Sequence, residues 1–201
     1  MFKTKIAALA FPALLLGSTA YAAQPAADED HISVKMVAAN PCLPDAKAKV
    51  EITSDGTAED MFIVASGLPP NTGFDFFVIQ VPTAPFGLAW YQGDVQSDAD
   101  GDAVQHFRGR FSIETFIVAP GVALAPRVFN DQPFPDAAQN PTTNPVQTYH
   151  LGMWFNFPAD AQAAGCPNTV TPFNGEHNAG IQVLNTSTYR DDHGPLRDLR
   201  P

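Results

Sequence analysis

The chain has 201 residues, with 21 acidic against 11 basic side chains and a formal net charge of −10. This length suits one domain with a substantial core. The acidic surface, which no basic cluster offsets, excludes nucleic acid and an anionic membrane surface as expected partners.

The first 23 residues have the pattern of a secretory signal peptide. Lys3 and Lys5 precede an apolar run over residues 6–16, and Ala20-Tyr21-Ala22 forms a small-x-small cleavage site. We expect cleavage close to residue 23 and a secreted or periplasmic mature protein. The alternative is a retained membrane anchor, but this apolar run is too short to span a bilayer, and no later run is long and apolar enough.

The chain contains two cysteines, Cys42 and Cys166, which lie far apart in the sequence. Their spacing excludes a local CxxC redox or zinc motif, and an exported protein meets an oxidising compartment. We therefore predict one disulfide that ties the start of the body to its last third. Two free buried thiols are the alternative.

Alternating apolar and polar residues predict a succession of short strands after a flexible acidic lead-in over residues 24–30. The expected strands cover residues 31–37, 47–53, 61–65, 74–81, 88–96, 103–111, 112–118, 147–157 and 180–186. Turn signals such as Asp55-Gly56 and Asp100-Gly101 separate them. Residues 158–164 predict the one helix, with proline in its first turn and Gly165 as its stop.

A proline-rich segment over residues 119–146 interrupts the strand pattern. Proline at this density is incompatible with a paired strand. Connections this long are usually functional or disordered. We expect a single domain over residues 31–188, with 119–146 as an insertion packed on it and 189–201 as a mobile charged tail.

Residues 58–81 hold the densest fold signal, because two apolar runs flank a turn rich in glycine and proline. We expect a buried strand pair at 61–65 and 74–81. The segment Ser66-Gly67-Leu68-Pro69-Pro70-Asn71-Thr72-Gly73-Phe74 and its surroundings over 64–81 resemble the G-L-x-P-x-T-x-Y segment of fibronectin type III and related immunoglobulin-like domains.

The resemblance implies an antiparallel immunoglobulin-like β-sandwich. With the helix and the proline-rich segment predicted above, we expect an all-β fold of this type with one short helix and a long Pro-rich loop. Two features depart from the family pattern. Phe74 replaces the usual Tyr, so the corner hydroxyl bond cannot form, and the segment lies early rather than late in the domain.

Two sets of side chains are candidate metal ligands. Asp94, Asp98, Asp100 and Asp102 offer the hard oxygen ligands that calcium prefers. A loop starting at Gln96, however, puts Phe107 where an EF-hand needs a bidentate Glu. The alternative is an exposed acidic hairpin tip.

The second set consists of His106, His150, Glu176 and His177, which distant strands would bring together to hold a transition metal. No paired histidine spacing supports the set, and the alternative is surface histidines that form only hydrogen bonds.

Aromatic residues near the expected loops are candidates for a binding platform that takes a glycan or a protein. They are Trp90, Tyr91, Phe129, Phe134 and Trp154. The alternative is that these rings belong to the core.

The sequence contains neither a nucleophile elbow nor a phosphate-binding glycine loop, and we name no catalytic residue. We therefore expect a secreted, non-catalytic protein that binds an extracellular or cell-envelope ligand or protein. The alternatives are a metal-binding protein or metal-dependent enzyme, with calcium or a transition metal as cofactor, and a purely structural envelope component.

Overall fold

The structure is a computed structural model that describes residues 30–113, 115–116, 146–171 and 177–199. The expected signal peptide, nearly all of the lead-in and the Pro-rich insertion up to residue 145 lie outside the described residues. The strands are β1 (Asp30–Ala38), β2 (Lys47–Ser54), β3 (Glu59–Ser66), β4 (Gly73–Ile79), β5 (Ala89–Gln96), β6 (Ala103–Gly109), β7 (Thr115–Phe116), β8 (Val146–Gln147), β9 (His150–Phe155) and β10 (Gln182–Asn185). The helical elements are α1 (Pro158–Ala163) and the short 3₁₀ turns η1 (Phe111–Ile113) and η2 (Pro195–Asp198).

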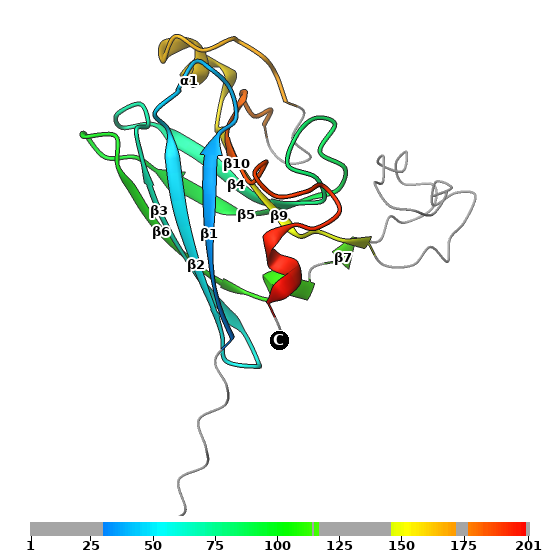
Figure 1. Cartoon of the computed structure of the whole chain (residues 1–201). Helices are drawn as coiled ribbons and strands as arrows, with labels where there is room; N and C mark the ends of the chain where they lie inside the picture. The colour runs from blue at the N-terminus through cyan, green and yellow to red at the C-terminus, as the bar shows by residue number, and fades with distance from the viewer. Residues whose placement is uncertain (1–29, 114, 117–145, 172–176, 200–201) are drawn as a thin grey trace, which may run out of the picture.

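Eight antiparallel strands form one sheet in the order β5-β4-β9-β10-β1-β2-β3-β6, and β7 and β8 form a separate pair. The sheet curves into a nearly closed barrel, so that β1, β2, β3 and β6 form one wall and β4, β5, β9 and β10 lie behind it (Figure 1). The prediction of an all-β protein is confirmed. An immunoglobulin-like sandwich is not confirmed, because the eight strands belong to one continuous sheet rather than two.

The two edge strands of this sheet, β5 and β6, meet at a seam. The side-chain amide of Gln105 donates to the backbone oxygen of Asp94 at 2.6 Å. The ring of Phe107 occupies the space beside Gly93, where an added Cβ would come within 2.6 Å of it. Side-chain contacts between β5 and β6 therefore help to close the barrel at this seam.

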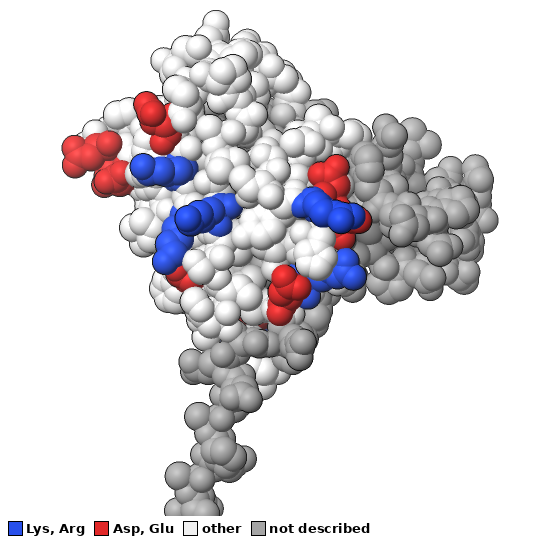
Figure 2. Space-filling model, viewed as in Figure 1, with Lys and Arg blue, Asp and Glu red and all other residues white. Residues whose placement is uncertain are grey.

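Strand alternation builds the barrel interior. Val50 and Ile52 of β2 face Ile63 and Met61 of β3 in the register, and all four side chains are fully buried. This burial confirms the alternation expected over residues 47–53. The polar residues between them face solvent, which is why this wall carries both signs of charge on its outer surface (Figure 2).

The buried strand pair expected at 61–65 and 74–81 is wrong as a pairing, although both segments are strands. β3 pairs with β2 and β6, whereas β4 pairs with β5 and β9. The connection between them crosses the end of the barrel and bonds to the β5–β6 hairpin. There the Leu68 amide donates to the Gly101 oxygen at 3.1 Å, and the Asn71 amide donates to the Asp98 oxygen at 2.9 Å.

The strand expected over residues 112–118 is wrong at residues 112–113 and confirmed at 115–116, and residues 114, 117 and 118 lie outside the described residues. The chain forms the 3₁₀ turn η1 before the two-residue strand β7. The carboxylate of Glu59, which is fully buried, accepts hydrogen bonds from the Ser112 amide at 2.9 Å and from the Ser112 hydroxyl. These bonds hold the chain in a turn and prevent an extended continuation of β6.

Part of the segment expected as a tail, residues 189–199, packs on the barrel. Leu196 and Leu199 are buried in the main core, and the Leu196 amide donates to the Tyr149 oxygen at 3.1 Å. The charged residues of this segment suggested a solvated end, but its turn η2 lies against η1 (Figure 1), and its two leucines are buried in the main core.

The predicted disulfide and helix are both present. Cys42 is bonded to Cys166, which follows α1, and α1 has proline in its first turn as expected. Figure 1 places α1 at the same end of the barrel as the β1–β2 connection that carries Cys42. Among the described residues, no helix has the length and apolar character needed to cross a membrane.

Candidate functional site

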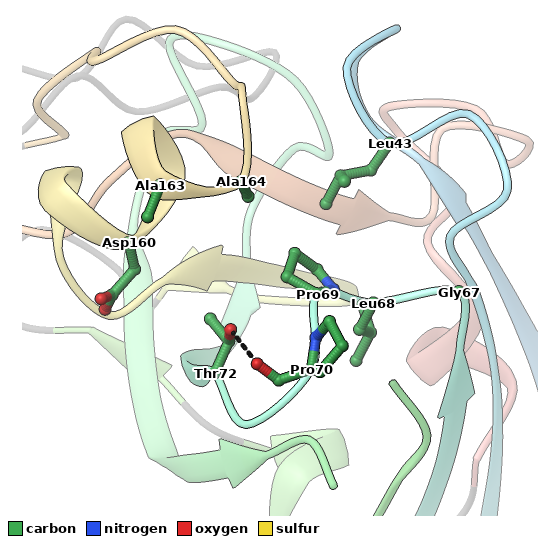
Figure 3. A pocket seen from close by; sticks show the side chains of 9 residues that line it. All are labelled: Leu43, Gly67, Leu68, Pro69, Pro70, Thr72, Asp160, Ala163 and Ala164. Carbon is green, nitrogen blue, oxygen red and sulfur yellow. Dashed lines mark hydrogen bonds between the residues drawn. The ribbon is translucent and has the colours of Figure 1, made fainter. Parts of the chain in front are cut away.

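A pocket of about 440 Å³ opens at the disulfide end of the barrel (Figure 3). Its walls are Leu43, the turn from Gly67 to Thr72, and the α1 end of the chain with Asp160, Ala163 and Ala164. Asp160 supplies its one ionisable side chain, and the Thr72 hydroxyl already donates to the Pro70 oxygen at 3.0 Å. With a single, partly buried carboxylate, the pocket lacks the converging polar groups that define a specific site.

A second group of side chains lies on the outer face of β4, β5 and β9, which we call the aromatic–acidic site. It consists of Asp75 and Phe77 on β4, Tyr91 and Asp94 on β5, Trp154 on β9, and His177. Phe74, Phe76 and Val78 point into the main core, so alternation turns Asp75 and Phe77 to the opposite face. The register then places Asp75 directly between Asp94 and Trp154.

Four aromatic rings form a continuous row across this face. The centroid of Phe77 lies 5.5 Å from that of Tyr91 and 5.3 Å from that of Trp154. Phe86, from the β4–β5 connection, meets Trp154 edge-on at 5.1 Å. These separations are those of favourable aromatic pairs, so the row is a packed unit rather than a set of isolated rings.

Gly152 makes room for the indole at the centre of this row. A Cβ at this position would lie 2.4 Å from the Trp154 ring and 2.9 Å from Ile79. Residues 152 and 154 share the outer face of β9, so the glycine lets the Trp154 ring lie flat along the strand.

Asp75 is the unusual member of the site. Its side chain is fully buried, and neither carboxylate oxygen has a hydrogen-bond partner among the described residues. Its nearest ionic neighbour is His177, whose Nε2 lies 3.4 Å from Oδ2. Burial raises the pKa of Asp75 to about 6, against the opposing influence of His177 and with a further small increase from Asp94.

Asp94 carries the second carboxylate of the site and is exposed. It accepts a hydrogen bond from the Tyr91 hydroxyl at 2.5 Å. Burial and this bond raise the pKa of Tyr91, so the phenol stays neutral and donates. Asp94 and Tyr91 therefore give the site a fixed acceptor at the solvent side of Asp75.

Two more buried polar atoms on β9 and just after it have no hydrogen-bond partner within the described part of the chain. They are the indole nitrogen of Trp154 and the side-chain oxygen of Asn156. Unsatisfied buried groups are rare in folded proteins and call for a specific explanation. Trp154 of β9 is paired with Asp75 of β4, so the indole N–H donor and the carboxylate acceptor are carried on the same face of neighbouring strands.

The expected metal ligands lie at different places in the fold. The Asp98 carboxylate accepts bonds from the amides of Asp100 and Asp102 at 2.9 and 3.0 Å, so it holds the β5–β6 turn. His106 lies on the outer face of β6, 2.7 Å from an Asp60 oxygen and stacked on Phe62.

The other two histidines of the expected metal set lie apart from His106 and from each other. His150 is fully buried, with Nδ1 2.9 Å from the Thr186 hydroxyl and Nε2 3.1 Å from the Arg190 oxygen, and burial lowers its pKa. His177 lies beside Asp75, and Glu176 is outside the described residues. Over residues 30–113, 115–116, 146–171 and 177–199, no three metal-ligating side chains gather.

The expected aromatic platform is brought together in part. Tyr91 and Trp154 join through Phe77, and Trp90 and Tyr91 are 45% and 40% exposed. Trp154 is buried, and Phe129 and Phe134 lie outside the described residues. Sequence reasoning missed Asp75, although a lone carboxylate inside the apolar run Phe74-Asp75-Phe76-Phe77-Val78-Ile79 is a usable signal.

Comparison with known proteins finds no family model, no curated protein and no solved structure that matches this chain.

Proposed function

We propose that this protein is an exported, non-catalytic binding protein whose extracellular or cell-envelope ligand occupies the aromatic–acidic site. The observation that supports this most is Asp75, whose buried carboxylate oxygens lack hydrogen-bond partners among the described residues. Burying a carboxylate that has an ionic neighbour at 3.4 Å but no hydrogen bond among the described residues is costly, since burying a polar group without a hydrogen bond costs on the order of 2–7 kcal/mol. A group kept under such a penalty beside a partly exposed aromatic row is a candidate binding residue.

Export is part of the proposal and is supported by the signal-peptide pattern and by the Cys42–Cys166 disulfide, which suits an oxidising compartment. An immunoglobulin-like sandwich stays a prediction. The proposed site depends only on the register of β4, β5 and β9 within the curved sheet.

Intrinsic fluorescence gives a local readout of the site, because the chain has two tryptophans. Trp154 belongs to the aromatic row, and Trp90 precedes Tyr91 on β5. A ligand bound beside Asp75 therefore alters an emission signal to which no remote tryptophan contributes.

The test compares the native protein with Asp75→Asn and with Asp100→Asn, which removes the same charge from the exposed β5–β6 turn. Each is mixed with a panel of glucose, N-acetylglucosamine, n-butylammonium, butyrate, a dipeptide, calcium and zinc. We expect one probe class to raise the melting temperature and change the emission of the native and Asp100→Asn proteins but not of Asp75→Asn. If no class does so, or if the response survives in Asp75→Asn, the proposed site is wrong.

The metal-binding alternative is decided in the same experiment. Calcium or zinc as the active probe class, with a stoichiometric metal content in the purified protein, would favour a metal site, and a calcium response that is lost in Asp100→Asn would favour the carboxylates of the β5–β6 turn.

A further inference from the structure

The charge balance of the aromatic–acidic site is negative. Asp75 and Asp94 face each other across β4 and β5, and the cationic group that acts on Asp75 among the described residues is His177. His177 can neutralise one carboxylate at most, and only when it is protonated. Neutral Tyr91 adds a donor but no positive charge.

The rings around the two carboxylates favour positive charge as well. Aromatic faces carry negative electrostatic potential and attract cations within about 6 Å of the ring centroid. Tyr91, Phe77 and Trp154 line the β4–β5–β9 face, and Phe157 lies 4.7 Å from the His177 ring on the other side. The same surface offers apolar contact to an alkyl chain.

On these grounds we infer that the ligand is a primary organic ammonium cation, with its charged group between Asp75 and Asp94 and its carbon chain along the aromatic row. The inference rests on the proposed function and names the chemical class that the site takes. A primary ammonium has three N–H donors, which suit the oxygens of Asp75, neither of which accepts a hydrogen bond from the described residues, and the exposed side chain of Asp94.

Other ligand classes fit this arrangement less well. A neutral sugar leaves two neighbouring carboxylates without a counter-charge, and an anion adds to the repulsion. A quaternary ammonium cannot donate to Asp75. A divalent metal prefers several oxygen or nitrogen ligands in one shell, and the described residues supply no such set of three.

The cation reaches the site beside His177 and Asp94. Asp75 is fully buried, whereas the His177 side chain is 26% exposed and Asp94 is exposed. The His177–Asp75 separation of 3.4 Å falls short of a hydrogen bond with good geometry. An ammonium group can therefore form the close contacts with Asp75 that His177 does not.

The experiment uses tryptophan fluorescence titrations of the full chain at pH 7.5 with matched four-carbon probes. These are n-butylammonium, n-butanol and butyrate, and tetramethylammonium serves as the cation without N–H donors. We expect saturable binding of n-butylammonium only, weakened at least tenfold by Asp75→Asn and several-fold by Asp94→Asn. Asp100→Asn should bind as the native protein does.

Circular dichroism melts show that each variant is folded, and Asp94→Asn tests the same claim from an exposed position if Asp75→Asn unfolds. Equal n-butylammonium affinity in the native protein and both site variants overturns the inference. Binding of n-butanol, butyrate or N-acetylglucosamine that depends on Asp75, without n-butylammonium binding, overturns the ligand class but leaves the proposed site intact. A lack of response to every probe contradicts both.

Discussion

A single carboxylate, Asp75, accounts for the most unusual chemistry of the molecule, and its titration affects stability. The unfolded chain releases this proton near the ordinary pKa of 3.8, whereas the folded protein keeps it until about pH 6. The folded state therefore loses stability relative to the unfolded state as the pH rises through this window. Asp94 and Tyr91 from β5, together with His177, are the titratable groups that face Asp75.

Asp75→Asn keeps the shape of the side chain but removes this titration. Relative to the native protein, we expect the free energy of unfolding of the variant to rise by about 2 kcal/mol between pH 4 and pH 7, because a pKa shift contributes about 1.36 kcal/mol per unit and part of it is already expressed at pH 4. Urea unfolding of both proteins at pH 4, 5, 6 and 7 measures the difference. Parallel pH profiles would show that Asp75 titrates normally.

Gly152 controls the position of the Trp154 indole. A methyl group at this position meets the ring at 2.4 Å. We therefore expect Gly152→Ala to lower stability by about 1–3 kcal/mol through overpacking and to shift the fluorescence emission maximum. Gly73→Ala is the control, because its added Cβ has ordinary contacts at 3.4 Å or more. Similar melting temperatures and emission for the two variants would contradict this account of the indole.

At the level of elements, local sequence patterns predicted most strands. The pairing of the strands and the turn η1 depend on contacts between residues far apart in the sequence. β2 was predictable because Val50 and Ile52 alternate with polar residues. The separation of β3 from β4 was not predictable. It depends on hydrogen bonds from Leu68 to Gly101 and from Asn71 to Asp98, which belong to a hairpin far along the chain. The turn η1 likewise depends on Glu59, which belongs to a distant strand.

The disulfide fixes α1 and the β1–β2 connection at one end of the barrel. It closes a loop of 124 residues. Replacing both cysteines by serine should lower stability by about 4–5 kcal/mol in the chain-entropy model. The aromatic–acidic site draws on other elements, so n-butylammonium affinity should change little as long as the variant is folded. A loss below 1 kcal/mol in urea unfolding would contradict the first expectation.

For the molecule as a whole, the barrel and its C-terminal segment form one cooperative body. Leu196 is fully buried in the same core as β9 and β10. We expect Leu196→Ala to destabilise the protein by about 2–5 kcal/mol, the usual range for a buried leucine. Arg190→Ala, at an exposed ion pair with Asp192, should leave stability nearly unchanged. Equal effects would indicate a tail that contributes little to the core.

The assembly of the candidate site also belongs to this scale. Asp75 and Asp94 become neighbours through the pairing of the consecutive strands β4 and β5, whereas Trp154 joins them only because β9 inserts next to β4 in the sheet. The sequence indicated Tyr91 and Trp154 as binding residues, but it held no information on strand order. The aromatic residues could therefore be predicted from the sequence. The position of the buried carboxylate at the centre of the site could be found only from the strand register.

The most direct test of the central claim is a carbon-13 NMR titration of the Asp75 carboxyl group with and without saturating n-butylammonium. We predict a pKa of about 6 in the free protein, because the carboxylate is buried without an adequate partner. The pKa should fall when n-butylammonium binds, since a cation beside the carboxylate favours its charged form. A free-protein pKa near 3.8, or a pKa that the ammonium leaves unchanged, would contradict the claim that this carboxylate is a cation-binding group.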